Sequence, residues 1–318
     1  MDILRLSEAF QECAFSMHAL DLSPSGWALT SPRVLRLLER LENVGTPLGE
    51  YVDGFYRGVV TGCNDAFIIS ASMRQQLVTE DAKSDELIKP LLRGRNLHRW
   101  KAVSANEYLI VIASSTNSEW PWSDARSNSE AERIFKRNYP AIYRHLSNYR
   151  ERLIVRNDQG KFYWELRPCL YYAEFGKSKI LYSEVSKSLY ACYDTTGAFG
   201  LKTTYSVPTN DLSFLAVLNS TLFDWYARYR FGNFGDAWEG GGLFFFAQYM
   251  ERVPIADRTA AQKAELTGLV EQILTDPQSN SVREIEREID EIVYQLYGLQ
   301  DAEIELIKQT YRDAGMEV

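Results

Sequence analysis

The chain has 318 residues, enough for one large domain or two ordinary ones, and either could bury a core without disulfide or metal support. Apolar residues make up 45%, charged residues 25% and aromatic residues 13%, a balance that excludes a disordered chain. The net charge of −8 comes entirely from residues 257–318, which hold six Lys/Arg and fourteen Asp/Glu, so the acidic total does not exclude a nucleic-acid partner for residues 1–256.

Targeting and redox signals are weak. No stretch approaches the roughly 18 apolar residues of a membrane span, and the N-terminus lacks the basic and then apolar pattern of a signal peptide. The cysteines are far apart and form no Cys-x-x-Cys pair, which indicates neither a disulfide framework nor a zinc site: Cys13, Cys63, Cys169 and Cys192. We expect a soluble, cytoplasmic protein with no membrane contact.

The predicted elements begin with an amphipathic helix in PRVLRLLERLENVG, with Pro32 near its start and Gly45 at its end. Short β-branched or aromatic runs then predict strands at 51–60, 66–69, 107–113, 179–185, 189–193 and 205–207. Helical patterns interrupt them at 84–92, 129–150 and 211–229. From Thr259 three helical stretches follow, divided by Asp276-Pro277 and Gly298, and Asp301 could cap the third.

This order predicts an α+β fold. Residues 1–45 form a lead-in segment with one helix, residues 46–256 a strand-rich domain, and residues 257–318 a helical acidic tail. No internal repeat is evident.

The stretch YRGVVTGCNDAFII, residues 56–69, raises the question of a phosphate-binding loop. A P-loop ends in Gly-Lys-Ser/Thr, but Gly62 is followed by Cys63 and Asn64, and no lysine is near. The favoured interpretation is a tight turn between two strands, because glycine and asparagine tolerate positive φ. Direct contact with a ligand is the alternative.

Two basic clusters stand out in the body. The stretch IKPLLRGRNLHRWK contains Lys89, Arg93, Arg95, Arg99 and Lys101 and no acid. Residues 126–156 carry three glutamates against Arg126, Arg133, Lys136, Arg137, Arg144, Arg150, Arg152 and Arg156. Arginine can donate two hydrogen bonds to a phosphate or to guanine, so the clusters indicate DNA binding. A solvated helix face with i,i+4 ion pairs is the alternative.

Aromatic clusters are equally ambiguous. Trp164, Glu165 and Arg167 stand at a predicted strand end, where Glu165 and Arg167 could contact base edges or form an ion pair covered by the indole. The glycine-rich segment 231–242 predicts a mobile loop that enters a buried strand and contacts the partner.

The sequence contains few of the motifs that would indicate a catalytic or metal-binding site. The three histidines (His18, His98 and His145) are well separated, which does not favour a metal cluster or a His-based triad. No two prolines are adjacent, so the Asn/Asp-Pro-Pro-Tyr/Phe loop of amino-methylating enzymes is absent from the sequence. Asp81-Ala82-Lys83 matches half of a Mg²⁺-nuclease pattern, but its polar surroundings favour a helix cap.

Several stretches in order carry a resemblance to a known family: YRGVVTGCNDAFII, SDELIKPLLRGRNLHRW, YPAIYRHL, WELR, KIL, FLAVLNSTLFDWY, LFFFAQYMERVPI and EIDEIVYQLYGL. Together they resemble the TaqI-like C-terminal specificity domain, the target recognition region of N6-adenine DNA methyltransferases and of fused type II restriction–modification enzymes. The resemblance extends from about Trp27 to about Ile307.

The resemblance implies a non-catalytic module that recognises sequence in double-stranded DNA for a methyltransferase domain or subunit, in restriction–modification or phage defence. It implies no cofactor in this chain, with S-adenosylmethionine expected on the methyltransferase. The implied DNA contacts are Lys89, Arg93, Arg95, Arg99, Lys101, Arg126, Arg133, Lys136, Arg137, Arg144, Arg156, Trp164, Glu165 and Arg167, and the acidic tail should stay clear of phosphates. The alternatives are a Mg²⁺-dependent nuclease using Asp65, Asp81 and Lys83, or a protein-interaction module acting through the helical tail.

Overall fold

The computed structural model describes residues 30–104 and 106–316, so Cys13, His18 and most of the lead-in segment lie outside the described residues. The helices are α2 (Pro32–Glu42), α3 (Leu48–Tyr51), α4 (Asn64–Phe67), α5 (Ala71–Glu80), α6 (Ser84–Leu87), α7 (Asn128–Asn138), α8 (Pro140–Ser147), α9 (Arg150–Ile154), α10 (Leu212–Leu218), α11 (Thr221–Arg230), α12 (Ala247–Met250), α13 (Ala260–Thr275), α14 (Val282–Leu296) and α15 (Asp301–Asp313). Within the described residues, two 3₁₀ turns complete the helical structure, η2 (Gly94–Asn96) and η3 (Tyr172–Gly176).

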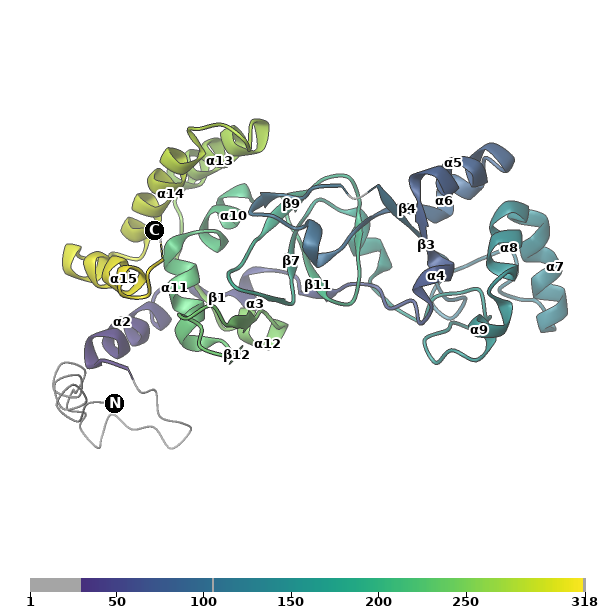
Figure 1. The fold of residues 1–318 in the computed structure, drawn as a ribbon, viewed down its shortest axis with the longest axis horizontal. Coiled ribbons are helices and arrows are strands. Elements are labelled where there is room, and N and C mark those ends of the chain that lie inside the picture. Colours follow the sequence, from purple (N-terminus) through teal and green to yellow (C-terminus); the bar gives the residue numbers. More distant parts are fainter. Residues whose placement is uncertain (1–29, 105, 317–318) are drawn as a thin grey trace, which may run out of the picture.

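The strands form four small sheets. The largest has the order β2 (Tyr56–Arg57), β11 (Thr204–Pro208), β7 (Lys179–Ser183), β9 (Cys192–Asp194) and β5 (Trp100–Lys101). A four-stranded sheet has the order β10 (Phe199–Gly200), β4 (Ile88–Leu92), β6 (Glu107–Ile110) and β3 (Ile68–Ser70). A three-stranded sheet has the order β12 (Asn233–Phe234), β13 (Gly242–Phe244) and β8 (Val185–Ser186). The last sheet pairs β1 (Thr46–Pro47) with β14 (Pro254–Ile255). Pairing is antiparallel except for β5 with β9 and β10 with β4. Figure 1 shows an elongated molecule with α13–α15 at one end, the sheets in the middle and α5–α9 at the other.

Helix α2 follows from its sequence. The Ser31 side chain accepts a hydrogen bond from the Val34 amide, Pro32 opens the first turn, and the buried side chains repeat at helical spacing. Gly45 then takes φ +84°, and a Cβ on it would meet the Ile255 carbonyl oxygen at 2.0 Å. Glycine is therefore required where β1 approaches β14.

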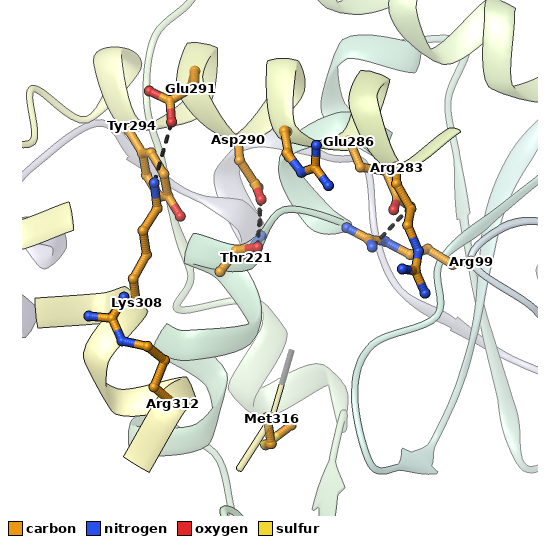
Figure 2. Close-up of a pocket in the computed structure, with 11 residues that line it drawn as sticks. Arg99, Thr221, Arg283, Glu286, Asp290, Glu291, Tyr294, Lys308, Arg312 and Met316 are labelled. Carbon is orange, nitrogen blue, oxygen red and sulfur yellow. Dashed lines mark hydrogen bonds and ion pairs between the residues drawn. The ribbon is translucent and has the colours of Figure 1, made fainter. Parts of the chain in front are cut away.

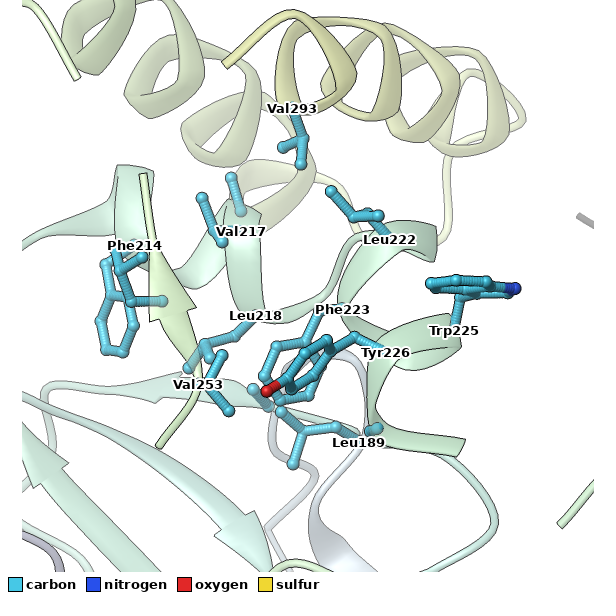
Figure 3. Packing of buried hydrophobic residues seen from close by; sticks show 14 of the residues in the cluster. Leu189, Phe214, Val217, Leu218, Leu222, Phe223, Trp225, Tyr226, Val253 and Val293 are labelled. Atoms are coloured by element: carbon cyan, nitrogen blue, oxygen red, sulfur yellow. The ribbon is translucent and has the colours of Figure 1, made fainter. Parts of the chain in front are cut away.

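Two large hydrophobic cores and a smaller cluster that includes Leu181 and Cys192 organise the described residues. The first joins α2, α10 and α11 to α13–α15 and one face of the largest sheet, and Figure 3 shows Leu218, Leu222 and Phe223 packing there beneath Val293 of α14. The second lies under α4–α9 and contains Trp122, Phe135 and Trp164. The tail helices bury their apolar side chains in the first core, which explains why an acidic segment folds onto the body.

Most predicted elements are present. The α+β fold is confirmed, as are the helices of the tail and the helical regions 129–150 and 211–229, which Pro140 and Asn219-Ser220 divide. The helix predicted over 84–92 is wrong beyond Leu87, because residues 88–92 pair as β4 between β6 and β10. The strand predicted over 51–60 shrinks to Tyr56–Arg57. Gln300, and not Asp301, caps α15.

The turn in TGCND is a structural element. Gly62 has φ +66°, the Thr61 hydroxyl donates to Asn64 Oδ1 at 2.7 Å, and Arg156 Nη1 donates to the Thr61 carbonyl at 2.5 Å. The run after it begins as α4 and becomes strand only at Ile68. Gly62 leaves the space that Arg156 and Asp158 occupy, since a Cβ there would approach both closely.

Candidate nucleic-acid interface

The first basic cluster divides into an outward half and an inward half. The outward half lies at η2, where Arg93, Gly94, Arg95 and Leu97 border a hollow of about 430 Å³. The opposite wall of this hollow, here called the η2 hollow, consists of Ser183, Val185, Ser186, Tyr190 and Thr203. Gly94 permits the close approach, since a Cβ on it would lie 2.9 Å from Ser183 Oγ.

Arg93 and Arg95 have different roles in this hollow. Arg93 donates to both carboxylate oxygens of Glu107, at 2.7 and 2.8 Å, and this bidentate pair fixes it against β6. Arg95 approaches Glu107 only at 3.5 Å, and 69% of its side chain is exposed. Arg95 is therefore the guanidinium that can reach a ligand.

Residues that sequence reasoning missed complete the hollow. Val185 and Tyr190 are exposed although they are large and apolar, and hydroxyl groups stand between them. Lys187 follows Ser186 and Lys202 precedes Thr203 in the sequence, and both are exposed and without an ion pair to any described residue. Single lysines and serines between short strands form no cluster in the sequence, so only the pairing of β7, β8 and β11 brings them to one surface.

The glycine-rich segment 231–242 forms the β12–β13 hairpin beside β8. Phe234 is 55% exposed at its edge. The expectation of a mobile loop does not fit the contacts, because Arg228 donates to the Ala237 carbonyl and the Trp238 ring lies 5.1 Å from Arg228 and 5.4 Å from Tyr311. The hairpin thus presents Phe234 from an anchored base.

The inward half of the cluster faces the C-terminal helices. Arg99 forms an ion pair with Glu286 at 2.9 Å and donates to the Asn219 carbonyl, and Trp100 is buried. Lys101 is exposed, but its Nζ lies 3.4 Å from the Leu274 carbonyl of α13. Lys89, half-buried on β4, lines a separate hollow with Tyr108.

The second cluster also divides. On α7 the exposed cations Arg133, Lys136 and Arg137 form no ion pair with any residue in the described ranges, and Arg126 precedes the helix with its side chain exposed. Nearby arginines are paired instead, Arg144 with Glu80, Arg150 with Glu132 and Arg152 with Asp65. Helix α7 lies at the end of the molecule far from α13–α15 (Figure 1).

Three of the predicted DNA-contact residues are buried and do not fit a role at a surface: Arg156, Trp164 and Glu165. Trp164 is stacked between Phe135 and Phe162, with ring centroids 5.1 and 5.0 Å away. Glu165 accepts hydrogen bonds from the Ser115 amide, Trp122 Nε1 and the Phe162 amide.

Arg156 donates to the carbonyls of Thr61 and Glu165, and burial lowers its pKa to about 10. The ion pair predicted between Glu165 and Arg167 is replaced by an exposed contact of Arg167 with Asp158 at 3.8 Å. Hydrogen bonds offset the desolvation of most buried polar groups here, whereas Arg156 Nε and Trp164 Nε1 are buried without a partner among the described residues.

The candidate nuclease residues are also engaged locally. Asp81 follows the last residue of α5 and accepts from the Lys83 amide at 3.2 Å, and Asp65 pairs with Arg152. The predicted side-chain cap is not formed, because Lys83 is the N-cap residue of α6 and no side chain caps that helix. Within residues 30–104 and 106–316, no three His, Cys, Asp or Glu side chains gather in a way that could hold a metal ion. The described cysteines are unpaired, and no described helix has both the length and the apolarity of a membrane span.

Comparisons with known proteins match the part of the chain that contains η2 and α7. Residues 89–238 match the TaqI-like C-terminal specificity domain. The type II methyltransferase M.MjaIV of Methanocaldococcus jannaschii is 24% identical over 254 residues, which cover 74% of this chain and 76% of that protein. The matched range is shorter than the expected resemblance and stops before the helical tail.

Two solved structures match the chain, and the first of them shares its fold. The type IIL restriction–modification enzyme MmeI, solved in complex with DNA, gives a TM-score of 0.54 at 14% identity, over 85% of this chain and 36% of that one. The type IIG restriction endonuclease BpuSI gives 0.44 at 12% identity, over 92% and 35%. The chain therefore spans about a third of each of these enzymes. The family match assigns residues 89–238 to the TaqI-like C-terminal specificity domain, and the similarity to MmeI shows a related fold.

Proposed function

We propose that this chain recognises sequence in double-stranded DNA and holds the duplex for a methyltransferase domain or subunit, without a catalytic part of its own. The methyltransferase supplies S-adenosylmethionine and methylates adenine at N6. The pair acts in restriction–modification or phage defence.

The η2 hollow is the observation that carries this proposal. It combines the largely exposed guanidinium of Arg95, three hydroxyl groups and the exposed ring of Tyr190, and the exposed Lys187 and Lys202 follow lining residues or precede them in the sequence. A guanidinium group can donate to base edges in the major groove, whereas lysines contact phosphates as point charges. The Ser183 and Ser186 hydroxyls donate to the Val185 and Ser188 carbonyls, so they offer the base an acceptor. Arg95 is thus the proposed base contact, and the lysines position the duplex.

Helix α7 supplies a second part of the proposed interface. Its unpaired cations Arg133 and Arg137 are four residues apart and share one face of the helix. Such a row suits the phosphates of one strand. Lys89, Lys101, Arg126, Lys136 and Arg144 remain predicted phosphate contacts, and Arg156, Trp164 and Glu165 support the interface from within.

The test is fluorescence anisotropy of the purified chain with a random-sequence duplex of roughly 30 bp at several salt concentrations. Wild type should bind with a negative dependence of log K on log salt. Arg95→Glu should weaken binding severalfold, whereas Arg36→Glu, an exposed arginine on α2 without an ion pair to a described residue, should not. Absence of binding by the wild type at about 50 mM salt would refute the proposal.

A further inference from the structure

The tail is acidic in total, but its cations are not scattered. Four of its six basic residues line one cleft of about 720 Å³ between α14, α15 and the body: Arg283, Arg287, Lys308 and Arg312. They form two i,i+4 pairs, one on each helix, so each pair faces one side. Arg99 of the body adds a fifth cation.

The acids of this cleft are largely occupied. Glu286 accepts from Trp100 Nε1 at 2.7 Å and pairs with Arg99 at 2.9 Å. Asp290 is buried and accepts from the amide and the hydroxyl of Thr221 at the start of α11. Glu291 lies 3.6 Å from Lys308. Five cations and three acids thus line the cleft, two of these acids are directed into the body, and Arg312 also pairs with Glu305 outside the lining.

The cations stand at two ends of the cleft. In Figure 2, Arg99 and Arg283 lie at one end and Lys308 and Arg312 at the other, with Asp290 and Thr221 between them. Glu291, the partner of Lys308, is eight residues after Arg283, which corresponds to about 12 Å along α14. One DNA strand advances about 3.4 Å per nucleotide, so the two ends match phosphates roughly three to four nucleotides apart better than a single small ion.

We infer that this cleft, formed by α14, α15 and Arg99, binds phosphates, and that they belong to the backbone of the DNA held at the η2 hollow. Arg99 follows Arg95 by four residues on one short segment, which connects the two surfaces. The inference rests on the proposed function and reverses the expectation that the acidic tail avoids phosphates. Tail and body together then clamp the duplex.

The experiment compares Arg283→Gln/Arg287→Gln with the matched control Arg36→Gln/Lys263→Gln, which removes two exposed cations outside the cleft. Circular dichroism and melting temperature should show that both variants fold. With the random-sequence duplex, the cleft variant should bind more weakly and lose about 0.9 of the salt slope for each phosphate contact removed. The control should behave as wild type.

Equal slopes for cleft variant and control, while Arg95→Glu still loses binding, would overturn the inference and leave the proposed function standing. Binding by neither wild type nor variants would refute the proposed function itself. A second arm then adds sodium tripolyphosphate and measures melting temperature. If tripolyphosphate stabilises wild type but not the cleft variant, while both bind the duplex with equal salt slopes, the site belongs to a free polyphosphate and its assignment to DNA is overturned.

Discussion

Trp100 Nε1 donates a 2.7 Å hydrogen bond to Glu286 Oε1, joining residues that are 186 positions apart. The same carboxylate pairs with Arg99, and Trp100 has φ +75°, a conformation that is costly for a bulky residue. Helix α14 therefore holds the segment that follows η2 in a strained conformation.

Glu286→Ala should lower the free energy of unfolding by about 1–3 kcal/mol, because it leaves the buried indole N–H without an acceptor. Urea denaturation followed by tryptophan fluorescence measures this change. Glu288→Ala, at an exposed position on the same helix, should change stability by less than about 0.5 kcal/mol. Similar losses in both variants would contradict the role given to Glu286.

Arg93 and Arg95 should separate stability from binding. Arg93→Ala breaks the bidentate contact with Glu107 and should cost about 1 kcal/mol of unfolding free energy. Arg95→Ala should leave stability within about 0.5 kcal/mol and weaken duplex binding severalfold. Urea unfolding measures the stability of each variant, and anisotropy titration measures its binding to the duplex. A stability loss in Arg95→Ala as large as that in Arg93→Ala would argue against an outward role of Arg95.

Glu165→Ala should destabilise the second core by at least about 3 kcal/mol, since it leaves Trp122 Nε1 and two buried amides without acceptors. Arg167→Ala, two residues away and exposed, is the control and should cost less than about 0.5 kcal/mol. Thermal unfolding reports both. If Glu165→Ala keeps the wild-type melting temperature but loses DNA binding, Glu165 contacts DNA after all.

His145 should make stability depend on pH. Burial lowers the pKa of His145, whose neutral ring donates from Nε2 to the Ala66 carbonyl at 2.9 Å. The unfolded chain binds a proton near a pKa of about 6.5, so stability is complete above that pH and falls as pH drops towards the folded pKa.

Urea unfolding at about pH 7.5 and about pH 5.5 should therefore show a smaller loss for His145→Gln than for wild type. His98→Gln, at an exposed position, serves as control and should keep the wild-type loss. An identical pH dependence in all three proteins would show that His145 does not contribute.

The sequence by itself determined the local elements and the class of the protein. Apolar spacing in α2 and in α13–α15, together with Gly62 and Gly298 at positive φ, specifies helices and turns through contacts within a few residues. The ordered motifs likewise indicated the specificity-domain family, because they lie in consecutive short stretches.

The tertiary structure alone decided which charged side chains are exposed and able to contact DNA. Arg95 and Arg99 look equivalent in the sequence, yet one faces solvent and the other pairs with Glu286. Trp164 and Glu165 resembled a contact pair and are core, and the cations of the acidic tail converge only because α14 and α15 pack together. Whether a charged side chain can contact DNA depends on its ion-pair and packing partners, which are distant in the sequence. A run of charged residues carries no information about those partners.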